Sequence, residues 1–554
     1  MKWTKMLAVA AMAMTLSVSG QTTSAPATAA AGDQGWTPLF NGKDFTGFYT
    51  VFKTAKKGPD TDGYFKVETV DGEPAVHVMG FPVLETKRDF GYFVTEKEYG
   101  DFDLKFQYKW GEKKHPPRAK AKRDAGCIYF VNGEDQVWPD GVECQVQEGD
   151  TGDLWVVGKT ISVNATIKDE PANSKGEFTY SSTGKSVTVS KRQQYKDATG
   201  AMKDVDGRIV QQQTADALTG WNTVEVIAKG NTSVHIVNGR IVNRLTDMQF
   251  IDGGKPLDHG KILFQAEGSE VYYRDMEIRP LGENETVPGT QAEYDARWQV
   301  NDRARPRPGR MEPVAETELA ASAKAPVNAV VLFDGKDLSN FLDSHWKLIP
   351  EENAVEITPN PKKAAAANAG AAPVKKEAAP LTSTLSPEEL AAKGNLVTKE
   401  AFGSCKVHLE FACPNPPKGK DQAQANSGVY LMGKYEMQVL DNTNNPTYAD
   451  GLAGAVYGEN PPLWESSRPS GEWNYYDIEF HRPIFGADGK VERPATVTAW
   501  LNGIKVQDNF ALTGPTEHQI RLPYVAHADK LPLMLQGHGQ VAKFRNIWVV
   551  PISD

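Results

Sequence analysis

The chain has 554 residues and a formal net charge of −10. This length exceeds what one ordinary hydrophobic core supports, so we expect about two domains. Lysine and arginine are scattered along the acidic chain without forming a basic stripe. This distribution excludes an extended nucleic-acid-binding surface from our expectations.

The N-terminus has the pattern of a bacterial secretory signal peptide. Lys2 and Lys5 precede an apolar run from Met6 to Val18, and small residues follow. The run is too short for a membrane span, and no later stretch is apolar enough for one. We therefore expect residues 1–20 to be cleaved, 21–35 to form a disordered tether, and the mature protein to be periplasmic or secreted. A retained N-terminal anchor is the alternative.

Four cysteines are present, and export permits disulfide bonds between them. Cys127 and Cys144 lie in neighbouring strand-like runs and can bridge across a hairpin. Cys405 and Cys413 lie in one strand-like run, about 27 Å apart if extended, so we do not expect them to bridge each other. None of the four has the spacing of a zinc site.

The chain contains two copies of one sequence pattern, in the same order in each half. The matched segments in the first and second copy are WTPLFNGKDFTGF (36–48) and VVLFDGKDLSNF (330–341), FVTEKEYGDFDLKFQY (93–108) and LVTKEAFGSCKVHLEF (396–411), GVECQVQE (141–148) and KYEMQVLD (434–441), GWNTVEVI (220–227) and EWNYYDIE (472–479), VHIVNGRIVN (234–243) and TAWLNGIKVQ (498–507), and KILFQAEGSEVYYRDMEIRPL (261–281) and LPLMLQGHGQVAKFRNIWVVPI (531–552). Their shared order indicates a tandem duplication.

The repeat defines two domains, 36–281 and 328–554. The intervening residues 282–327 are polar and proline-rich, which is typical of a linker. An Ala-, Lys- and Pro-rich stretch at about 360–380 lies inside the second repeat and is predicted to be a disordered insertion.

Both repeats show mostly the two-residue periodicity of β-strands. Asn-Gly turns at Asn238-Gly239 and Asn502-Gly503 separate apolar runs, which indicates hairpins. Long helical periodicity is scarce. We predict an all-β protein made of two tandem jelly-roll β-sandwiches.

The ordered set of motifs resembles the 3-keto-disaccharide hydrolase family, long known as a domain of unknown function. The set is LF-G-KD-L, LVT, NSGVY, YE-QVLD, GAVYG, EWN, LNG, QGHG and FRNI, and the second copy carries it in full. The resemblance spans about 36–281 and 330–552. It implies a concanavalin A-like, laminarinase-like sandwich and an enzyme that cleaves 3-keto-glycosides.

Cleavage of such a substrate can proceed by elimination. The C3 ketone acidifies the C2 hydrogen, a base removes it, the C1 substituent leaves, and water adds back. This route needs a general base, a stabiliser of the enolate oxygen, and an acid for the leaving group.

Both copies keep Glu-x-Gln at the same place, so Glu436 and Glu143 are the candidate bases. Strand alternation puts Glu436 and Gln438 on one face, and Tyr435, Met437 and Val439 on the other. His538 is a candidate for proton transfer, and Arg545 and Arg274 are candidates for enolate stabilisation. The predicted substrate-binding residues are Asn426, Tyr430, Gln438, Asp441, Tyr457 and Gln536 in the second copy, and Gln145, Glu148, Trp155, Gln265 and Glu267 in the first.

The first copy differs from the second at several of these positions. NSG of the second copy aligns with AGC (125–127), and the histidine of QGHG aligns with Glu267. The sequence requires no cofactor, but an acidic run of Glu143, Glu148, Asp150 and Asp153 is a candidate for divalent cation binding.

Plainer interpretations compete with these assignments. The Glu-x-Gln pair can be a solvated strand face, His538 a structural histidine, and each arginine a partner of a carboxylate; Trp221 and Trp473 are expected in the core. At the level of the whole protein, the alternatives are a non-catalytic tandem carbohydrate-binding protein and a conventional laminarinase-like glycoside hydrolase. A 3-keto substrate also implies a sugar 3-oxidoreductase as functional partner.

Overall fold

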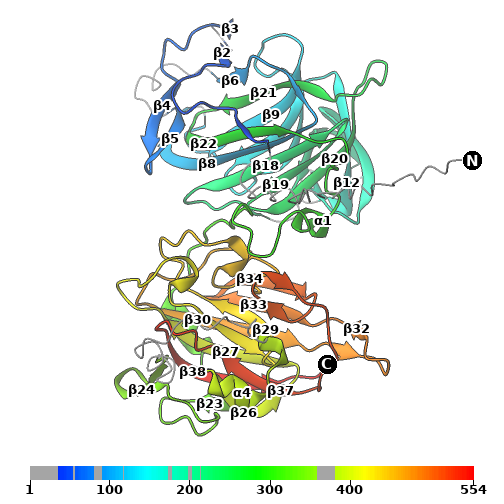
Figure 1. The fold of residues 1–554 in the computed structure, drawn as a ribbon. Coiled ribbons are helices and arrows are strands. Elements are labelled where there is room, and N and C mark those ends of the chain that lie inside the picture. Colours follow the sequence, from blue (N-terminus) through cyan, green and yellow to red (C-terminus); the bar gives the residue numbers. More distant parts are fainter. Residues whose placement is uncertain are drawn as a thin grey trace, which may run out of the picture.

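The computed structural model describes residues 35–53, 56–79, 90–116, 118–171, 177–196, 202–211, 214–358 and 381–554. In these ranges the chain forms two β domains, one above the other in Figure 1, with the helix-bearing linker between them. The predicted signal peptide and the predicted insertion at 360–380 lie outside the described residues, as does the tether up to residue 34. None of the helices in the described part is long and apolar enough to cross a membrane.

The first domain contains the strands β1 to β22. Their bounds are β1 Thr37–Pro38, β2 Phe48–Phe52, β3 Lys56–Lys57, β4 Phe65–Val70, β5 Glu73–Val78, β6 Gly91–Thr95, β7 Tyr99–Gly100, β8 Phe102–Lys114, β9 Asp124–Asn132, β10 Asp140–Gln147, β11 Leu154–Val157, β12 Ile161–Pro171, β13 Phe178–Tyr180, β14 Lys185–Ser190, β15 Arg192–Lys196, β16 Met202–Asp206, β17 Arg208–Val210, β18 Asn222–Lys229, β19 Thr232–Val237, β20 Arg240–Phe250, β21 His259–Ala266 and β22 Ser269–Pro280.

The second domain contains the strands β23 to β38. Their bounds are β23 Val330–Phe333, β24 Lys347–Ile349, β25 Ala354–Glu356, β26 Leu396–Phe402, β27 Cys405–Ala412, β28 Ser427–Leu431, β29 Tyr435–Val439, β30 Trp473–His481, β31 Ile484–Phe485, β32 Val491–Arg493, β33 Thr496–Leu501, β34 Ile504–Ala511, β35 Thr516–Glu517, β36 Ile520–Arg521, β37 Leu531–Leu535 and β38 Lys543–Pro551.

Helices are short and lie outside the sheets. They are α1 Gln291–Asp295 and α2 Glu316–Ser322 in the linker, α4 Pro387–Ala392 in the second domain, and the 3-10 turns η2 Pro350–Glu352, η3 Thr382–Thr384, η4 Asp421–Ala423 and η5 Ala449–Gly451. The predicted all-β fold of two tandem jelly-roll sandwiches is confirmed.

In the second domain two antiparallel sheets enclose the core. The back sheet has the order β24-β25-β38-β27-β30-β33-β34, with β23 beside β38, and the front sheet has the order β26-β37-β28-β29. Alternate side chains of both sheets, such as Leu409 and Phe411 from β27 and Val429 and Leu431 from β28, meet in one buried cluster. Each such side chain contributes roughly 1.5–3 kcal/mol on burial, so this shared core fixes which strand faces point outward.

The first domain repeats this plan. Its strands β6, β21, β9 and β10 correspond to the front sheet, and β22, β8, β18, β19 and β20 correspond to the back sheet. Additional strands, including β11, β12 and β17, continue the hydrogen bonding, so front and back belong to one 20-stranded sheet. The duplication inferred from sequence is therefore a duplication of the sandwich.

All four cysteines are buried and free. Cys127 and Cys144 lie in neighbouring strands, as predicted, and are opposite each other in the β9–β10 pair. Their thiols do not form a disulfide bond.

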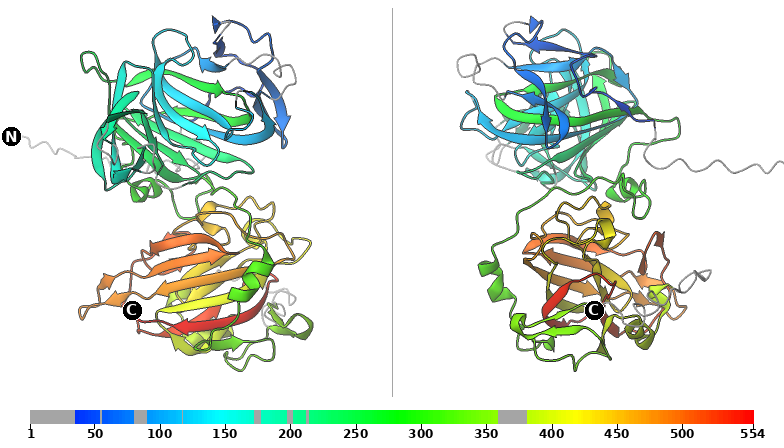
Figure 2. Two further views of the ribbon diagram at one scale, coloured as in Figure 1. Left: turned by 180° about the vertical axis from the view of Figure 1, so that it is seen from behind. Right: turned by 60° about the vertical axis from the view of Figure 1, so that its left-hand side comes forward.

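The linker runs between the two domains (Figure 2). Side-chain contacts tie it to both of them. After α1, Arg297 forms ion pairs with the buried Asp103 (2.6 Å) and Glu225 (3.1 Å) of the first domain. After α2, the carbonyl of Ala323 accepts hydrogen bonds from Trp548 and Asn546 of the second domain. Both ends of the linker are thus anchored.

Replacing Arg297 with alanine should destabilise the first domain. Glu225 would lose its only ion-paired cation among the described residues, while Tyr294 would still donate a hydrogen bond to it. We expect a loss of about 2 kcal/mol in the free energy of unfolding, measured by urea denaturation. The matched control is Arg310→Ala, which removes a 3.5 Å pair with the exposed Glu312 and should cost about 0.5 kcal/mol or less. Equal effects of the two substitutions would contradict the assigned role of Arg297.

Candidate functional site

The outer face of the front sheet carries a buried carboxyl group in the second domain. Tyr435, Met437 and Val439 of β29 pack in the core, so Glu436 and Gln438 point to the opposite face, as predicted. Glu436 is opposite Tyr430 of β28, and Gln438 is opposite Gly428. A side chain at Gly428 would place its Cβ 2.1 Å from Glu436 Oε1, so glycine is required for the carboxyl to lie flat over the sheet.

Hydrogen bonds hold the Glu436 carboxyl in place. The Tyr430 hydroxyl donates to Glu436 Oε2 at 2.7 Å, and Gln536 Nε2 donates to the Tyr430 hydroxyl at 3.2 Å. With its amide turned to satisfy its neighbours, Gln438 donates to Glu436 Oε1 at 3.2 Å. The pKa of Glu436 is raised to about 8, chiefly by burial; the hydrogen bond from Tyr430 opposes the rise, and the nearby Glu517 adds to it.

A pocket of about 370 Å³ opens over Glu436. Six residues predicted from the sequence line it: Asn426, Tyr430, Glu436, Tyr457, Gln536 and His538. His538 is exposed at the rim, where its Nδ1 lies 2.9 Å from Gln540 Oε1. The structure therefore gathers residues that are spread over more than a hundred positions of the chain.

Four further lining residues were not found from the sequence: Thr382, Gln422, Glu517 and His518. The hydroxyl of Tyr457 lies 2.9 Å from His518 Nδ1 and 2.8 Å from the hydroxyl of Tyr448, so two phenols and an imidazole form a chain. Glu517 accepts the backbone N–H of Thr382 at 2.8 Å. These residues come from loops and short elements without periodicity, and no pattern in the sequence marks them.

Two assignments in the second domain are corrected by the structure. Arg545 lies on the outer face of the back sheet, where it pairs with Glu410 (2.6 Å) and stacks on Trp473. The whole sandwich separates it from Glu436, so it cannot stabilise charge in that pocket. Asp441 is buried away from the pocket, where it accepts hydrogen bonds from Ser470 (2.6 Å) and from the backbone of Thr443 (3.0 Å), which indicates a structural role.

The first domain has an equivalent but more acidic cluster. Gly126 is opposite Gln145 as Gly428 is opposite Gln438, so the structural counterpart of Asn426 is Asp124. This register corrects the sequence alignment of NSG with AGC by one residue. A Cβ on Gly126 would lie 2.2 Å from Glu143 Oε1 and 2.3 Å from Gln265 Oε1, so these two side chains converge above that glycine.

Three carboxyl groups share the first site with one arginine. Asp124 and Glu267 hydrogen bond to each other, and Arg118 pairs with both, at 2.9 Å from Glu267. Burial raises the pKa values of Asp124, Glu143 and Glu267, and the neighbouring carboxyls raise that of Glu143 further. Burial and repulsion between like charges thus favour protonated carboxyls here.

Other predicted residues of the first domain divide into two groups. Gln145 is buried on β10, and Trp155 of β11 is opposite Glu143, so both are neighbours of the cluster. Arg274 is on the back sheet, bonded to Gln107 (2.8 Å) and stacked on Trp221, which repeats the Arg545–Trp473 arrangement. The arginine of this site is therefore Arg118. The two tryptophans are half-buried under arginines and do not lie in the core as expected.

The acidic run proposed for cation binding does not form a metal site. Glu148 pairs with Arg123, Asp150 with Lys122, and Asp153 with Arg208, so only Glu143 faces the cluster. Within the described ranges, no group of three or more His, Cys, Asp or Glu side chains is arranged to hold a metal ion.

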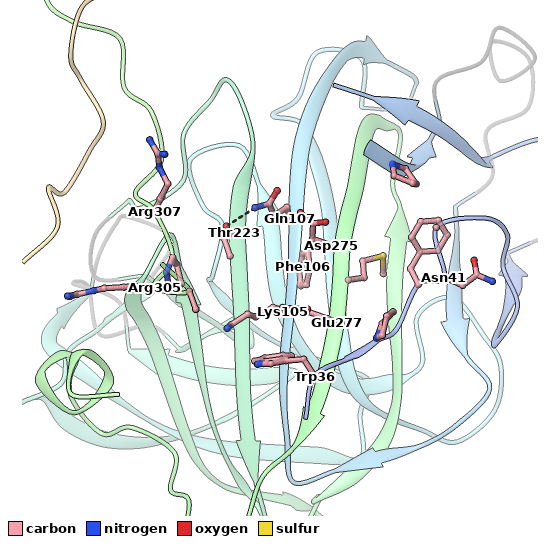
Figure 3. Close-up of a pocket in the computed structure, with 17 residues that line it drawn as sticks. Trp36, Asn41, Lys105, Phe106, Gln107, Thr223, Asp275, Glu277, Arg305 and Arg307 are labelled. Atoms are coloured by element: carbon pink, nitrogen blue, oxygen red, sulfur yellow. Dashed lines mark hydrogen bonds between the residues drawn. The ribbon is translucent and has the colours of Figure 1, made fainter. Parts of the chain in front are cut away.

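A larger pocket, of about 930 Å³, is elsewhere. It is a groove between the outer face of the first domain's back strands, with Lys105, Gln107 and Glu277, and the linker residues Arg305 and Arg307 (Figure 3). None of the predicted site residues lines it. We therefore place the candidate sites on the two front sheets.

The fold and the sites define the chain as a tandem pair of jelly-roll β-sandwiches, each with buried carboxyls among amides on its front sheet. A family model described as a 3-keto-alpha-glucoside-1,2-lyase-like domain matches residues 35–279 and 328–550. The chain belongs to this family of carbohydrate-active domains, with two copies in tandem.

Solved structures similar to the chain include two candidate glycosyl hydrolases from Parabacteroides distasonis. One is 34% identical, with 41% of this chain and 85% of that chain covered and a TM-score of 0.34. The other is 22% identical, with 45% and 94% covered and a TM-score of 0.26. A carbohydrate-binding module from Bacillus subtilis is 8% identical, with 42% and 95% covered and a TM-score of 0.23. No curated protein matches the chain.

The raised pKa of Glu436 predicts a specific pH dependence of stability. Between its ordinary pKa of 4.5 and about 8, the folded state holds a proton that the unfolded state releases, so this group makes stability fall as pH rises. Glu436→Gln should remove that contribution. We expect the stability of the wild type relative to Glu436→Gln to fall by roughly 3 kcal/mol from pH 5 to pH 8 in urea denaturation. A pH-independent difference between the two proteins would show that Glu436 titrates like an exposed glutamate.

Proposed function

We propose that the second domain cleaves the glycosidic bond of 3-keto-glycosides, including 3-keto-disaccharides, by elimination followed by hydration. The observation that carries this proposal is one buried, proton-holding carboxyl, Glu436, under a pocket of amides, phenols and imidazoles. A conventional glycosidase uses two carboxyls that flank the bond. The other carboxyl of the lining, Glu517, accepts backbone hydrogen bonds from Thr382 and His518, which favours a structural role for it.

In the first step Glu436 removes the proton from C2 of the sugar. The C3 ketone makes this proton acidic, and a pKa of about 8 makes Glu436 a stronger base than an ordinary glutamate. The electron pair of the C2–H bond moves to the ketone oxygen as an enolate. The Tyr430 hydroxyl, which donates to Glu436 Oε2, orients the carboxyl for this transfer.

The enolate oxygen needs donors, and the described pocket lining contains no Lys or Arg. Gln536, Asn426 and the Tyr457 hydroxyl supply N–H and O–H donors in place of the arginine expected from the sequence. The enolate pair then forms the C1–C2 double bond as the C1–O bond breaks. His518 or His538 gives a proton to the leaving oxygen. Water then adds to C1 and gives its proton to the histidine that protonated the leaving group, and Glu436 returns its proton to C2.

In the first domain, Glu143 is the proposed base of a second site. Glu267 and Asp124, which hydrogen bond to each other, are the proposed proton donors in place of the histidine of the second site. Arg118 supplies a positive charge beside them. Gln145, Gln265 and Trp155 are proposed to contact the sugar. Burial raises the pKa of Glu267 to about 8, so this carboxyl can still donate a proton at neutral pH.

The proposal places the protein outside the cytoplasm of a bacterium, after cleavage of the signal peptide. A sugar 3-oxidoreductase is the proposed source of the keto substrate, because the elimination needs the C3 ketone to be present before it begins. A sugar-binding protein without catalysis is the second candidate, since amide-lined pockets on β-sandwiches also bind sugars.

The deciding experiment incubates the mature protein with a 3-keto-disaccharide and with its unoxidised parent, with and without EDTA. We expect only the keto sugar to be cleaved, and kcat/KM to rise with pH toward about 8 as Glu436 loses its proton. Glu436→Gln should lower kcat by about 10²–10⁴-fold in the second domain, and Glu143→Gln should abolish turnover in the first.

Arg545→Lys is a matched control that should leave turnover unchanged, because Arg545 lies on the back sheet beside Glu410 and lysine keeps its charge. Binding of the keto sugar without cleavage would leave a tandem sugar-binding protein. Cleavage of the unoxidised parent would indicate a conventional glycosidase. Loss of all turnover with EDTA would show that the reaction requires a divalent metal ion.

A further inference from the structure

The linker contacts the second domain next to its pocket. Residues 300–303 run between the two domains, and three of them touch loops of the second domain. Each of these three contacts involves the sequence neighbour of a pocket-lining residue. The lining residues concerned are Tyr457, His518 and Gln422, all of which lie outside the core strands of the front sheet.

Val300 and Asn301 make the first two contacts. A Cβ on Gly458 would lie 3.0 Å from Val300 Cγ1, so the two residues are packed together directly after Tyr457. Asn301 Oδ1 accepts the backbone N–H of Gln519 at 3.0 Å, directly after His518. The backbone N–H of Asn301 donates to the buried Asp450 at 2.9 Å, and the Asp450 carbonyl accepts the N–H of Gly458 at 2.9 Å. One linker residue therefore joins two loops of the pocket.

Arg303 makes the third contact. Its guanidinium pairs with Asp421, directly before Gln422, and its Nη1 donates to the carbonyl of Pro446 at 3.2 Å. Gln422 in turn donates to Thr447 (2.7 Å) and to the carbonyl of Gly451 (3.0 Å). Arg303 thus fixes both the turn that carries Gln422 and the loop to which Gln422 is bonded.

We propose that residues 300–303 of the linker are positioning residues of the second domain's site. Loops are less rigidly held than strands, and His518 and Gln422 lie in such segments. Tyr457 is bonded to the front sheet by its backbone N–H, which donates to the carbonyl of Glu436 at 3.1 Å, but the residues after it are a loop that the linker contacts. Reacting groups misplaced by about 1 Å can lose about 100-fold in rate, so holding these loops affects turnover even if it adds little stability. The site is therefore complete only when the linker is docked, and the effect on turnover rests on the proposed function.

The linker also connects this segment to the first domain. Arg305, two residues further, is buried and pairs with Asp295 of α1 at 2.9 Å, and it lines the groove against the first domain in Figure 3. A displacement of the first domain would act on the 300–303 segment through this connection. The second site thereby depends on a part of the chain that lies outside its own sandwich.

The test uses the full mature chain with Arg303→Ala, and with Asn301→Gly, which removes the side chain while allowing the positive φ of 61° at this position. Arg303→Lys is the rescue variant. Arg310→Ala is the matched control, because Arg310 is on the same linker but bonds to Ser467 and Glu312, away from the pocket. Backbone hydrogen exchange is measured by mass spectrometry in 421–424, 446–458 and 516–519, together with kcat and KM for a 3-keto-disaccharide.

We expect about 10-fold faster exchange in 421–424 and 446–458 of Arg303→Ala and in 516–519 of Asn301→Gly, with unchanged exchange in β28 and β29 and in Arg310→Ala. The kcat should fall about 10-fold without a change in melting temperature, and Arg303→Lys should restore most of it. Unchanged loop exchange in the variants would overturn the proposal, whatever their activity. Faster exchange with unchanged kcat and KM would also overturn it, provided that the wild type is active. An inactive wild type would refute the proposed function alone, because the exchange data still decide whether the linker holds the loops.

Discussion

A carboxyl group buried on the outer face of a β-sheet is the constraint on which each site depends. Outer faces of sandwiches are normally solvated, and a charge buried there without a cation is costly. At Glu436 the cost is met by keeping a proton and by the hydrogen bond from Tyr430. Gly428 provides the space that the carboxyl occupies. This packing explains why Glu436 keeps its proton to a higher pH than an exposed glutamate does.

The buried carboxyl is surrounded by different residues in the two domains. In the second, phenols, amides and imidazoles surround one proton-holding carboxyl. In the first, Asp124 and Glu267 bring further carboxyls, and Arg118 enters from a loop to balance them. Because the sandwich and the strand register are retained while the pocket residues differ, the duplication provides two sites with different proton donors on one chain.

The back sheets explain why Arg545 and Arg274, which recur at the same place in both repeats, are not site residues. In both domains an arginine of the last strand stacks across one intervening strand on a tryptophan: Arg545 of β38 on Trp473, which begins β30, and Arg274 of β22 on Trp221, which directly precedes β18. The two arginines lie on the outer face of the back sheet, where Arg545 also bonds to Glu410 and Arg274 to Gln107. Their recurrence reflects a structural requirement of the sandwich, on the side away from both pockets.

The sequence by itself determined the repeat, the all-β fold and the faces of the front strands. Strand alternation is local, so it correctly directed Glu436 and Gln438 outward and Met437 inward. The ordered motifs shared with the family supplied the other five predicted residues of the pocket. The sequence did not determine which sheet each strand joins, and so it placed Arg545 with Glu436. It also missed Asp124 by a one-residue register error, because strand pairing, not letter similarity, sets the equivalence. Gln422, His518, Arg118 and the linker contacts were decided only by the tertiary structure, because loops carry no periodicity and meet the site only when distant segments pack together.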